Sequence, residues 1–270
     1  MYNTLTLPTV IKTSHQIQSD FLKRTVDLEI FSPDNVLGNE RINLLLVNDG
    51  QDLAQMDMEN TLNHLYETWK IEPTVVVGIK ASADRLMEYG MANRPDFKKR
   101  GAKAASYTDF IINELLPYVQ REVDLTINGK RAFAGFSLGG LTAFDVAWNN
   151  DRYFDAVGVF SGSFWWRKKD LKAGYTDDDR ILHEMIRETR TNPALKFWLM
   201  TGTNDETADR NHNFIIDSID DTIDVVKEIM KKGYKRPHDI FYYEMVGGKH
   251  DVPTWGKAMP KFLEWAFGVH

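Results

Sequence analysis

Short apolar runs alternate with longer stretches of helical spacing along almost the whole chain, and this rhythm constrains the fold more than any other feature. The runs Leu44-Leu45-Leu46-Val47 and Val75-Val76-Val77-Gly78-Ile79 are typical of strands buried on both faces of a sheet. Strands that alternate with helices predict an α/β fold, with a mostly parallel central sheet and helices on both faces. The predicted strands are residues 16–18, 25–31, 41–47, 74–79, 131–136, 156–160, 196–200 and 239–246, and the predicted helices are residues 56–69, 107–123, 138–149, 215–232 and 254–267.

The chain length of 270 residues is ordinary for one large α/β domain, and such a domain buries enough core to fold without a metal or disulfide. No repeat, low-complexity run or flexible linker divides the sequence. Two stretches interrupt the alternation, a polar one at residues 81–106 and a charged insertion at residues 164–193. Loops of this length usually form lids or binding segments. We therefore predict a single domain over residues 1–270, with a lid or pocket insertion at residues 164–193.

Composition excludes several classes of chemistry and partner. The chain has no cysteine, which excludes a disulfide framework, a thiolate zinc site, an iron–sulfur cluster and a cysteine nucleophile. Its net charge of −6 argues against a nucleic-acid partner, because such binders normally present a basic face. The N-terminus has no basic start, and no segment approaches the roughly 18 apolar residues of a membrane span. The sequence as written predicts a cytoplasmic protein with no membrane partner; a trimmed leader would instead indicate export.

The motif Gly135-Phe136-Ser137-Leu138-Gly139 stands where its chemistry requires it, after a predicted buried strand and before a predicted helix. Small neighbours let a serine occupy so tight a turn, and the N-terminus of the helix directs free N–H groups and a positive dipole end toward it. A glycine-rich turn without chemistry is the alternative. The context favours Ser137 as a nucleophile.

A serine nucleophile needs a base, and in the order serine, acid, histidine the base comes last. His250 follows the last predicted strand, at the edge of the sheet where ligands bind in such folds. It is the predicted general base, with a solvated loop histidine as the alternative. Four other histidines, in the charged insertion, in polar stretches or at the terminus, are assigned no catalytic role: His183, His212, His238 and His270.

The acid of such a triad should follow the strand between nucleophile and base. Asp205 lies at the exit of the strand predicted at residues 196–200, where its carboxylate could accept the Nδ1–H of His250 and fix the tautomer. Glu206 and Asp209 are the competing carboxylates, and an ordinary salt bridge is the alternative role.

Two backbone N–H groups are needed to hold an oxyanion. One belongs to Leu138, the residue after the nucleophile, and the other to the loop after an early buried strand. That loop contains Asp49-Gly50-Gln51, in which the glycine permits close backbone approach, so the Gln51 N–H is the second candidate. An ordinary Asp-Gly turn explains the local sequence equally well.

A calcium-loop pattern places oxygen-bearing residues at positions 1, 3, 5 and 9, which are Asp209, Asn211, Asn213 and Asp217. Phe214 stands at position 6, where a glycine usually makes the sharp turn. A polar loop in which Asp217 begins a helix is the alternative. The pattern indicates at most a structural calcium that would steady the loop carrying Asp205.

Taken together, four blocks resemble the Putative esterase family of α/β hydrolases, from about residue 20 onward: Leu45-Leu46-Val47-Asn48-Asp49-Gly50-Gln51, Gly135-Phe136-Ser137-Leu138-Gly139-Gly140, Gly202-Thr203-Asn204-Asp205, and Gly247-Gly248-Lys249-His250 with Trp255. This family includes enterochelin esterases, feruloyl and acetyl-xylan esterases, S-formylglutathione hydrolases and mycolyltransferases. The resemblance implies an α/β-hydrolase fold and supports Gln51, Asp205 and His250 in their roles.

Three further residues follow more loosely from this resemblance. Trp165 and Trp166 lie in a stretch that borders the pocket in bacterial members, and Arg85 lies in a segment that resembles a polar loop near the nucleophile. The two tryptophans could also wall an aromatic or sugar-bearing substrate, although aromatics near a strand end belong more often to the core.

These features predict a serine carboxylic ester hydrolase that works through an acyl-enzyme and needs no cofactor for catalysis. The expected partner is a small-molecule ester, such as an aromatic, sugar or siderophore ester. Two alternatives remain open: acyl transfer to a carbohydrate or alcohol acceptor, and a catalytically silent module that binds a sugar or siderophore.

Overall fold

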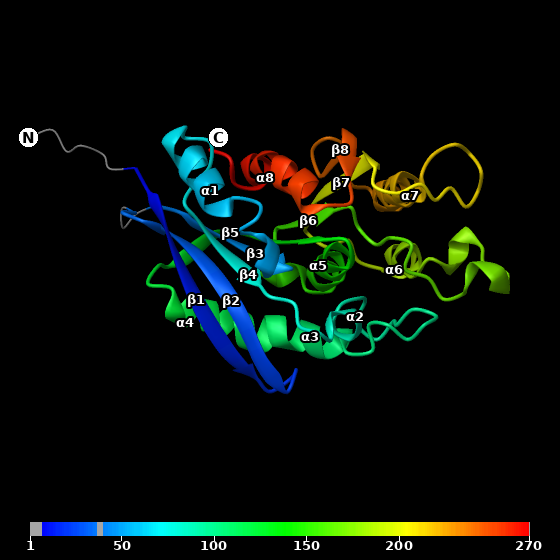
Figure 1. Cartoon of the computed structure of the whole chain (residues 1–270), viewed down its shortest axis with the longest axis horizontal. Coiled ribbons are helices and arrows are strands. Elements are labelled where there is room, and N and C mark those ends of the chain that lie inside the picture. Colours follow the sequence, from blue (N-terminus) through cyan, green and yellow to red (C-terminus); the bar gives the residue numbers. More distant parts are fainter. Residues whose placement is uncertain (1–6, 37–39, 270) are drawn as a thin grey trace, which may run out of the picture.

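The computed structural model describes residues 7–36 and 40–269 (Figure 1); the N-terminal residues 1–6 and His270 lie outside the described residues. One eight-stranded sheet runs through it, in the spatial order β1-β2-β4-β3-β5-β6-β7-β8. The strands are β1 (Thr9–Ser19), β2 (Arg24–Asp34), β3 (Ile42–Asn48), β4 (Thr74–Ile79), β5 (Ile127–Phe136), β6 (Ala156–Phe160), β7 (Lys196–Asn204) and β8 (Ile240–Lys249).

The sheet is parallel from β4 to β8, and only β2 runs antiparallel to both of its neighbours. Parallel strands need crossover connections, which here are the helices. They are α1 (Met58–Glu67), α2 (Arg85–Glu88), α3 (Ala104–Phe110), α4 (Leu116–Glu122), α5 (Leu138–Asn149), α6 (Ile181–Glu188), α7 (Asp217–Lys231) and α8 (Val252–Phe267). The predicted α/β class with a mostly parallel sheet is confirmed.

Helices cover both faces of the sheet. In Figure 1, α1 and α8 lie together on one side and α3 and α4 on the other. Two apolar clusters match these layers: α1 and α8 contribute Leu62 and Phe262 to one, whereas α4, α5 and α7 contribute Val119, Phe144 and Ile229 to the other. No helix in the described ranges has the length and apolar character needed to cross a membrane.

Several predicted elements differ in extent from the structure, most clearly the N-terminal hairpin and the helix before β5. The strands expected at residues 16–18 and 25–31 are parts of β1 and β2, which form a much longer antiparallel hairpin. The helix expected at residues 107–123 begins at Ala104 and contains a wide π turn (Ile111–Leu115) between α3 and α4. Pro117 follows this turn, and a proline has no N–H to donate to the preceding turn, so the wider turn accommodates it.

The insertion at residues 164–193 contains α6 and is packed into the molecule. Phe164 and Trp166 are fully buried within it. Arg180, at the start of α6, donates to the buried Asp221 carboxylate of α7 at 2.5 Å. These contacts attach the insertion firmly to one helical layer.

Candidate active site

Ser137 stands in the turn between β5 and α5, in a backbone conformation that is strained for any residue other than glycine. Its φ is 53° and its ψ is −120°. A Cβ at Gly135 would lie 2.4 Å from the Gly139 carbonyl oxygen, and a Cβ at Gly139 would lie 2.5 Å from Asp49 Oδ2. The spacing of the motif therefore reflects a turn that leaves no room for a side chain at Gly135 or Gly139.

The end of β6 and the turn after it hold Ser137 in place. The Ser137 N–H donates to the Phe160 carbonyl at 2.9 Å, and its carbonyl accepts from the Ser163 N–H at 3.1 Å. The Ser137 Oγ lies 3.3 Å from the Oγ of buried Ser163. Within the described ranges, no hydrogen bond joins Ser137 to His250, so the resting hydroxyl pairs with Ser163.

The predicted acid and base come from two adjacent parallel strands. Asp205 directly follows β7, and His250 directly follows β8. The facing atoms, Asp205 Oδ2 and His250 Nδ1, are 3.9 Å apart. The His250 side chain is 41% exposed, whereas that of Asp205 has no exposed surface. The carboxylate is thus fixed, and the imidazole has room to move; such hydrogen bonds often shorten only when substrate binds.

Two hydroxyl groups hold the Asp205 carboxylate, one on each oxygen. Ser161 Oγ donates to Oδ1 at 3.0 Å, and Thr201 Oγ1 donates to Oδ2 at 3.1 Å. Both residues are almost fully buried. The sequence pattern did not indicate either of them, because their role depends on which strands are neighbours.

The competing carboxylate, Glu206, has different surroundings. The backbone N–H of Ser218, at the start of α7, donates to it. Burial and the nearby Asp217 carboxylate raise the pKa of Glu206. Asp205 therefore faces the histidine, whereas Glu206 faces the adjacent helix. The third candidate, Asp209, accepts the N–H groups of Asn213 and Phe214 in the following loop.

The loop after β3 presents the predicted second oxyanion donor. Asp49 adopts a left-handed conformation with φ 60°, and residues Gly50–Asp52 form a single tight turn. A Cβ on Gly50 would lie 2.3 Å from the Gly78 carbonyl carbon, so only glycine fits. In the described part of the chain, the Gln51 N–H has no acceptor. Leu138 opens α5, where the first N–H groups have no partner within the helix.

Arg85, the predicted substrate-binding residue, braces this loop through Asp49, and its contact with substrate stays a prediction. Its guanidinium donates to both oxygens of Asp49, from Nε at 2.6 Å and from Nη2 at 2.8 Å. It also lies over the Tyr89 ring, 5.0 Å from the centroid. The Tyr89 hydroxyl in turn accepts the Asp49 N–H at 3.2 Å. The bidentate pair orients the loop that carries Gln51.

The two tryptophans of the insertion have different roles. Trp166 has no exposed surface and donates its indole N–H to the Arg94 carbonyl at 2.9 Å. It is a core residue, so the predicted contact with substrate is corrected for this side chain. Trp165 is partly exposed and stacks under the Arg100 guanidinium, 4.8 Å from the ring centroid.

The predicted calcium loop is held by its own hydrogen bonds. Besides the two N–H groups that Asp209 accepts, Asn211 and Asn213 both donate to Asp220, and Asp217 accepts the Arg210 N–H. Within residues 7–36 and 40–269, no group of three or more histidine, aspartate or glutamate side chains is arranged to hold a metal ion. The structural calcium at this loop stays a prediction.

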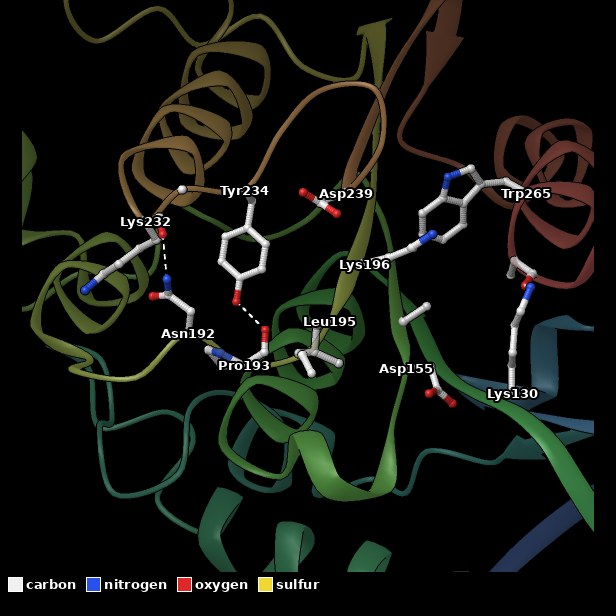
Figure 2. A pocket seen from close by; sticks show the side chains of 14 residues that line it. Lys130, Asp155, Asn192, Pro193, Leu195, Lys196, Lys232, Tyr234, Asp239 and Trp265 are labelled. Carbon is white, nitrogen blue, oxygen red and sulfur yellow. Dashed lines mark hydrogen bonds between the residues drawn. The ribbon is translucent and has the colours of Figure 1, made fainter.

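A pocket of about 630 Å³ lies at the amino-terminal ends of β6, β7 and β8, opposite the ends that carry the predicted triad (Figure 2). Several of its polar groups already have partners: the Tyr234 hydroxyl donates to the Pro193 carbonyl, and the Asn192 amide donates to the Lys232 carbonyl. None of the predicted triad residues lines it. Open α/β sheets bind ligands at the carboxyl ends of their strands. The candidate site lies at those ends, and this pocket does not.

A sequence model of the Putative esterase family matches residues 19–266, which is most of the chain. The chain belongs to the Putative esterase family. The matched region includes the predicted triad and both predicted oxyanion donors. No curated protein sequence matches the chain.

Solved structures similar to this family member have the same fold at low sequence identity. The enterobactin esterase FES from Shigella flexneri is 20% identical, with a TM-score of 0.72 over 96% of this chain and 61% of that one. An IroE-like serine hydrolase from Shewanella oneidensis is 18% identical, with a TM-score of 0.72 over 95% of this chain and 80% of that one. A ferulic acid esterase is 15% identical, with a TM-score of 0.70 over 96% and 98%. The chain thus spans about three fifths of the length of the enterobactin esterase it matches.

Proposed function

We propose that the protein hydrolyses carboxylic esters with Ser137 as nucleophile, His250 as general base and Asp205 as the acid that orients it. The observation that carries this proposal is the strained elbow at Ser137, with a free helix N-terminus behind it and an Asp205–His250 pair at the exits of β7 and β8. Strain of this kind persists where surrounding structure enforces it, and it concentrates at functional sites. Membership of the Putative esterase family supports the same reaction class.

The reaction would proceed in two halves. Ser137 Oγ attacks the ester carbonyl while His250 takes its proton, and the negative oxygen accepts hydrogen bonds from the Leu138 and Gln51 N–H groups. His250 then protonates the leaving alcohol, which leaves an acyl-enzyme on Ser137. A water molecule, deprotonated by His250, attacks this acyl group, and His250 returns the proton to Ser137 Oγ as the bond to the acyl group breaks and the acid is released. Asp205 stabilises the imidazolium in both halves, and every step uses only these groups and water.

The substrate is proposed to be a small-molecule ester. Similar proteins are named for enterobactin and for ferulic acid. Trp165 stays partly exposed in the insertion that follows β6, where it could border the acyl or alcohol part of such a molecule. A panel of p-nitrophenyl esters of increasing chain length, feruloyl esters, acetylated sugars and a catecholate trilactone would identify the class.

Ser137→Ala tests the reaction itself. We expect the variant to keep its circular-dichroism spectrum and melting temperature and to lose p-nitrophenyl acetate turnover by several orders of magnitude. A fluorophosphonate probe should label the wild type at Ser137 and leave the variant unlabelled. Unchanged turnover in the variant would refute the proposal, and a wild type that resists the probe would favour a silent binding module. Products measured in the presence of an added alcohol distinguish hydrolysis from acyl transfer.

A further inference from the structure

A chain of two hydrogen bonds leads from α8 to the predicted catalytic carboxylate. The Trp255 indole Nε1 lies 2.9 Å from Ser161 Oγ, and Ser161 Oγ lies 3.0 Å from Asp205 Oδ1. Ser161 is 2% exposed and Trp255 is 7% exposed, so water does not compete for these bonds. The three residues come from α8, from the turn after β6 and from the end of β7.

Which group donates in each of these two hydrogen bonds follows from the chemistry of the side chains. An indole N–H can only donate, and an ionised carboxylate can only accept. The Trp255 N–H therefore occupies the Ser161 oxygen, and the single hydroxyl hydrogen of Ser161 is left to donate to Asp205. A hydrogen bond from a polarised hydroxyl to a buried carboxylate is charge-assisted and is stronger than a neutral one.

The backbone at Ser161 indicates that the hydroxyl matters. Its φ is 50°, a left-handed conformation in which glycine would be less strained. Its N–H donates to the Met200 carbonyl of β7 at 2.7 Å, which holds the turn against the strand that carries Asp205. A serine in this conformation, buried and aimed at a carboxylate, makes a hydrogen bond that glycine could not make.

We propose that Ser161 is a positioning residue for the triad, oriented by Trp255 and acting through Asp205. This inference rests on the proposed function, because it assigns Asp205 the task of orienting His250. With Ser161 on Oδ1 and Thr201 on Oδ2, the carboxylate cannot rotate, and Oδ2 stays directed at His250 Nδ1. Without the Ser161 hydroxyl, one carboxylate oxygen loses its buried partner, and the carboxylate is free to turn away from the imidazole.

The experiment is a double-mutant cycle on Ser161 and Trp255, with p-nitrophenyl acetate as substrate. We expect Ser161→Ala and Ser161→Gly each to lower kcat by about 10- to 100-fold, the range typical for a hydrogen bond to a charged group, with KM changed less than about twofold. Glycine relieves the φ of 50°, so the two variants separate loss of the hydroxyl from backbone strain, and the glycine variant decides if alanine does not fold. Trp255→Phe should also lower kcat, but by a clearly smaller factor when Ser161 is already alanine.

Two matched controls have the same chemistry away from the site. Ser19→Ala removes a buried hydroxyl that donates to the Glu114 carboxylate at 2.6 Å, on the edge strand β1. Trp148→Phe removes a buried indole N–H that donates to the Thr189 hydroxyl at 3.0 Å. Both should keep kcat within about twofold of the wild type, whatever they do to stability, because neither is joined to the predicted triad.

Wild-type kcat in both Ser161 variants would overturn the inference, as would a rise in KM alone. Independent, multiplicative effects of Ser161→Ala and Trp255→Phe would also overturn it, because Trp255 would then act only through its own contact with the His250 ring. Failure of the proposed function has a different signature, since Ser137→Ala would then retain turnover whatever the Ser161 variants do.

Discussion

Two carboxylates follow β7 side by side, and their surroundings predict different contributions to catalysis. Asp205 Oδ2 faces His250, whereas Glu206 accepts a hydrogen bond from the start of α7. We expect Asp205→Asn to lower kcat by about 10³- to 10⁴-fold, because an amide cannot stabilise the imidazolium or fix its tautomer. Glu206→Gln is the isosteric control and should stay within a few-fold of the wild type. Equal losses in the two variants, measured as kcat on one ester, would contradict this assignment.

At the scale of single residues, the sequence predicts best the roles that a local motif defines. Ser137 is recognisable because its strained turn requires glycines at fixed offsets on the same segment. Ser161 carries no such local signal, since its partners Asp205 and Trp255 are 44 and 94 positions away in the chain. The burial of Trp166 has no local signal for a related reason, because the charged segment around it gives no sign that Gly90 and Gly101 leave room for its ring in the core.

At the scale of elements, the sequence predicts the bounds of buried strands and helices better than those of exposed ones. The bounds of β4, α5 and β6 match the sequence prediction residue for residue, because strands buried on both faces read as continuous apolar runs and a glycine motif marks the start of α5. The sequence predicts only part of the β1–β2 hairpin, since β1 is mostly exposed and its side chains are largely polar. Its pairing with β2 comes from the backbone, which composition does not show.

The insertion at residues 164–193 is attached to α7 by an ion cluster whose removal should cost stability. Arg180 donates to Asp221 at 2.5 Å and to Asp224 at 2.7 Å, and its side chain is only 5% exposed. We expect Arg180→Met to lower the free energy of unfolding by about 2 kcal/mol, because it removes one of the two arginines that donate to buried Asp221, and Arg210 remains as the other. Urea denaturation measures this loss, and limited proteolysis should show earlier cleavage between residues 164 and 193.

Arg187 on the same helix provides the matched control. Its ion pairs with Asp178 and Glu228 are 3.4 and 3.5 Å long, and its side chain is 36% exposed. Exposed pairs of this kind contribute little, so Arg187→Met should change the free energy of unfolding by less than about 1 kcal/mol. A similar loss in both variants would mean that the buried cluster does not anchor the insertion.

At the scale of the whole molecule, the site is a consequence of sheet order. The strands β5, β6, β7 and β8 are neighbours in this order, so the residues that follow them lie side by side. The nucleophile follows β5, the two serines Ser161 and Ser163 follow β6, the acid follows β7 and the base follows β8. A parallel sheet brings all four exits to one edge, although 113 positions separate Ser137 from His250 (250 − 137). The sequence order of the motifs predicts the triad, but contacts that cross between strands appear only when the sheet is assembled.

Two buried titratable groups give the folded molecule opposite responses to pH. Burial lowers the pKa of His183, in α6, to about 3, from an ordinary value of 6.5. Burial raises the pKa of Asp145, in α5, to about 7, from an ordinary value of 3.8. Between about pH 4 and 6.5, the unfolded chain binds a proton at His183 that the native protein does not, so this group makes stability rise with pH. At Asp145 the native protein binds the extra proton, so stability falls as pH rises through the same window.

Because the contributions of His183 and Asp145 to the pH dependence of stability oppose each other, they partly cancel in the wild type. Single substitutions should separate them. Each group contributes a slope of up to about 1.4 kcal/mol per pH unit. Relative to the wild type, His183→Gln should make the slope of unfolding free energy against pH more negative between pH 4 and 6.5, since only the Asp145 contribution of the pair remains. Asp145→Asn should make that slope more positive by a similar amount. Urea denaturation at three pH values in this window measures both, and curves parallel to the wild type would show that neither group titrates differently on folding.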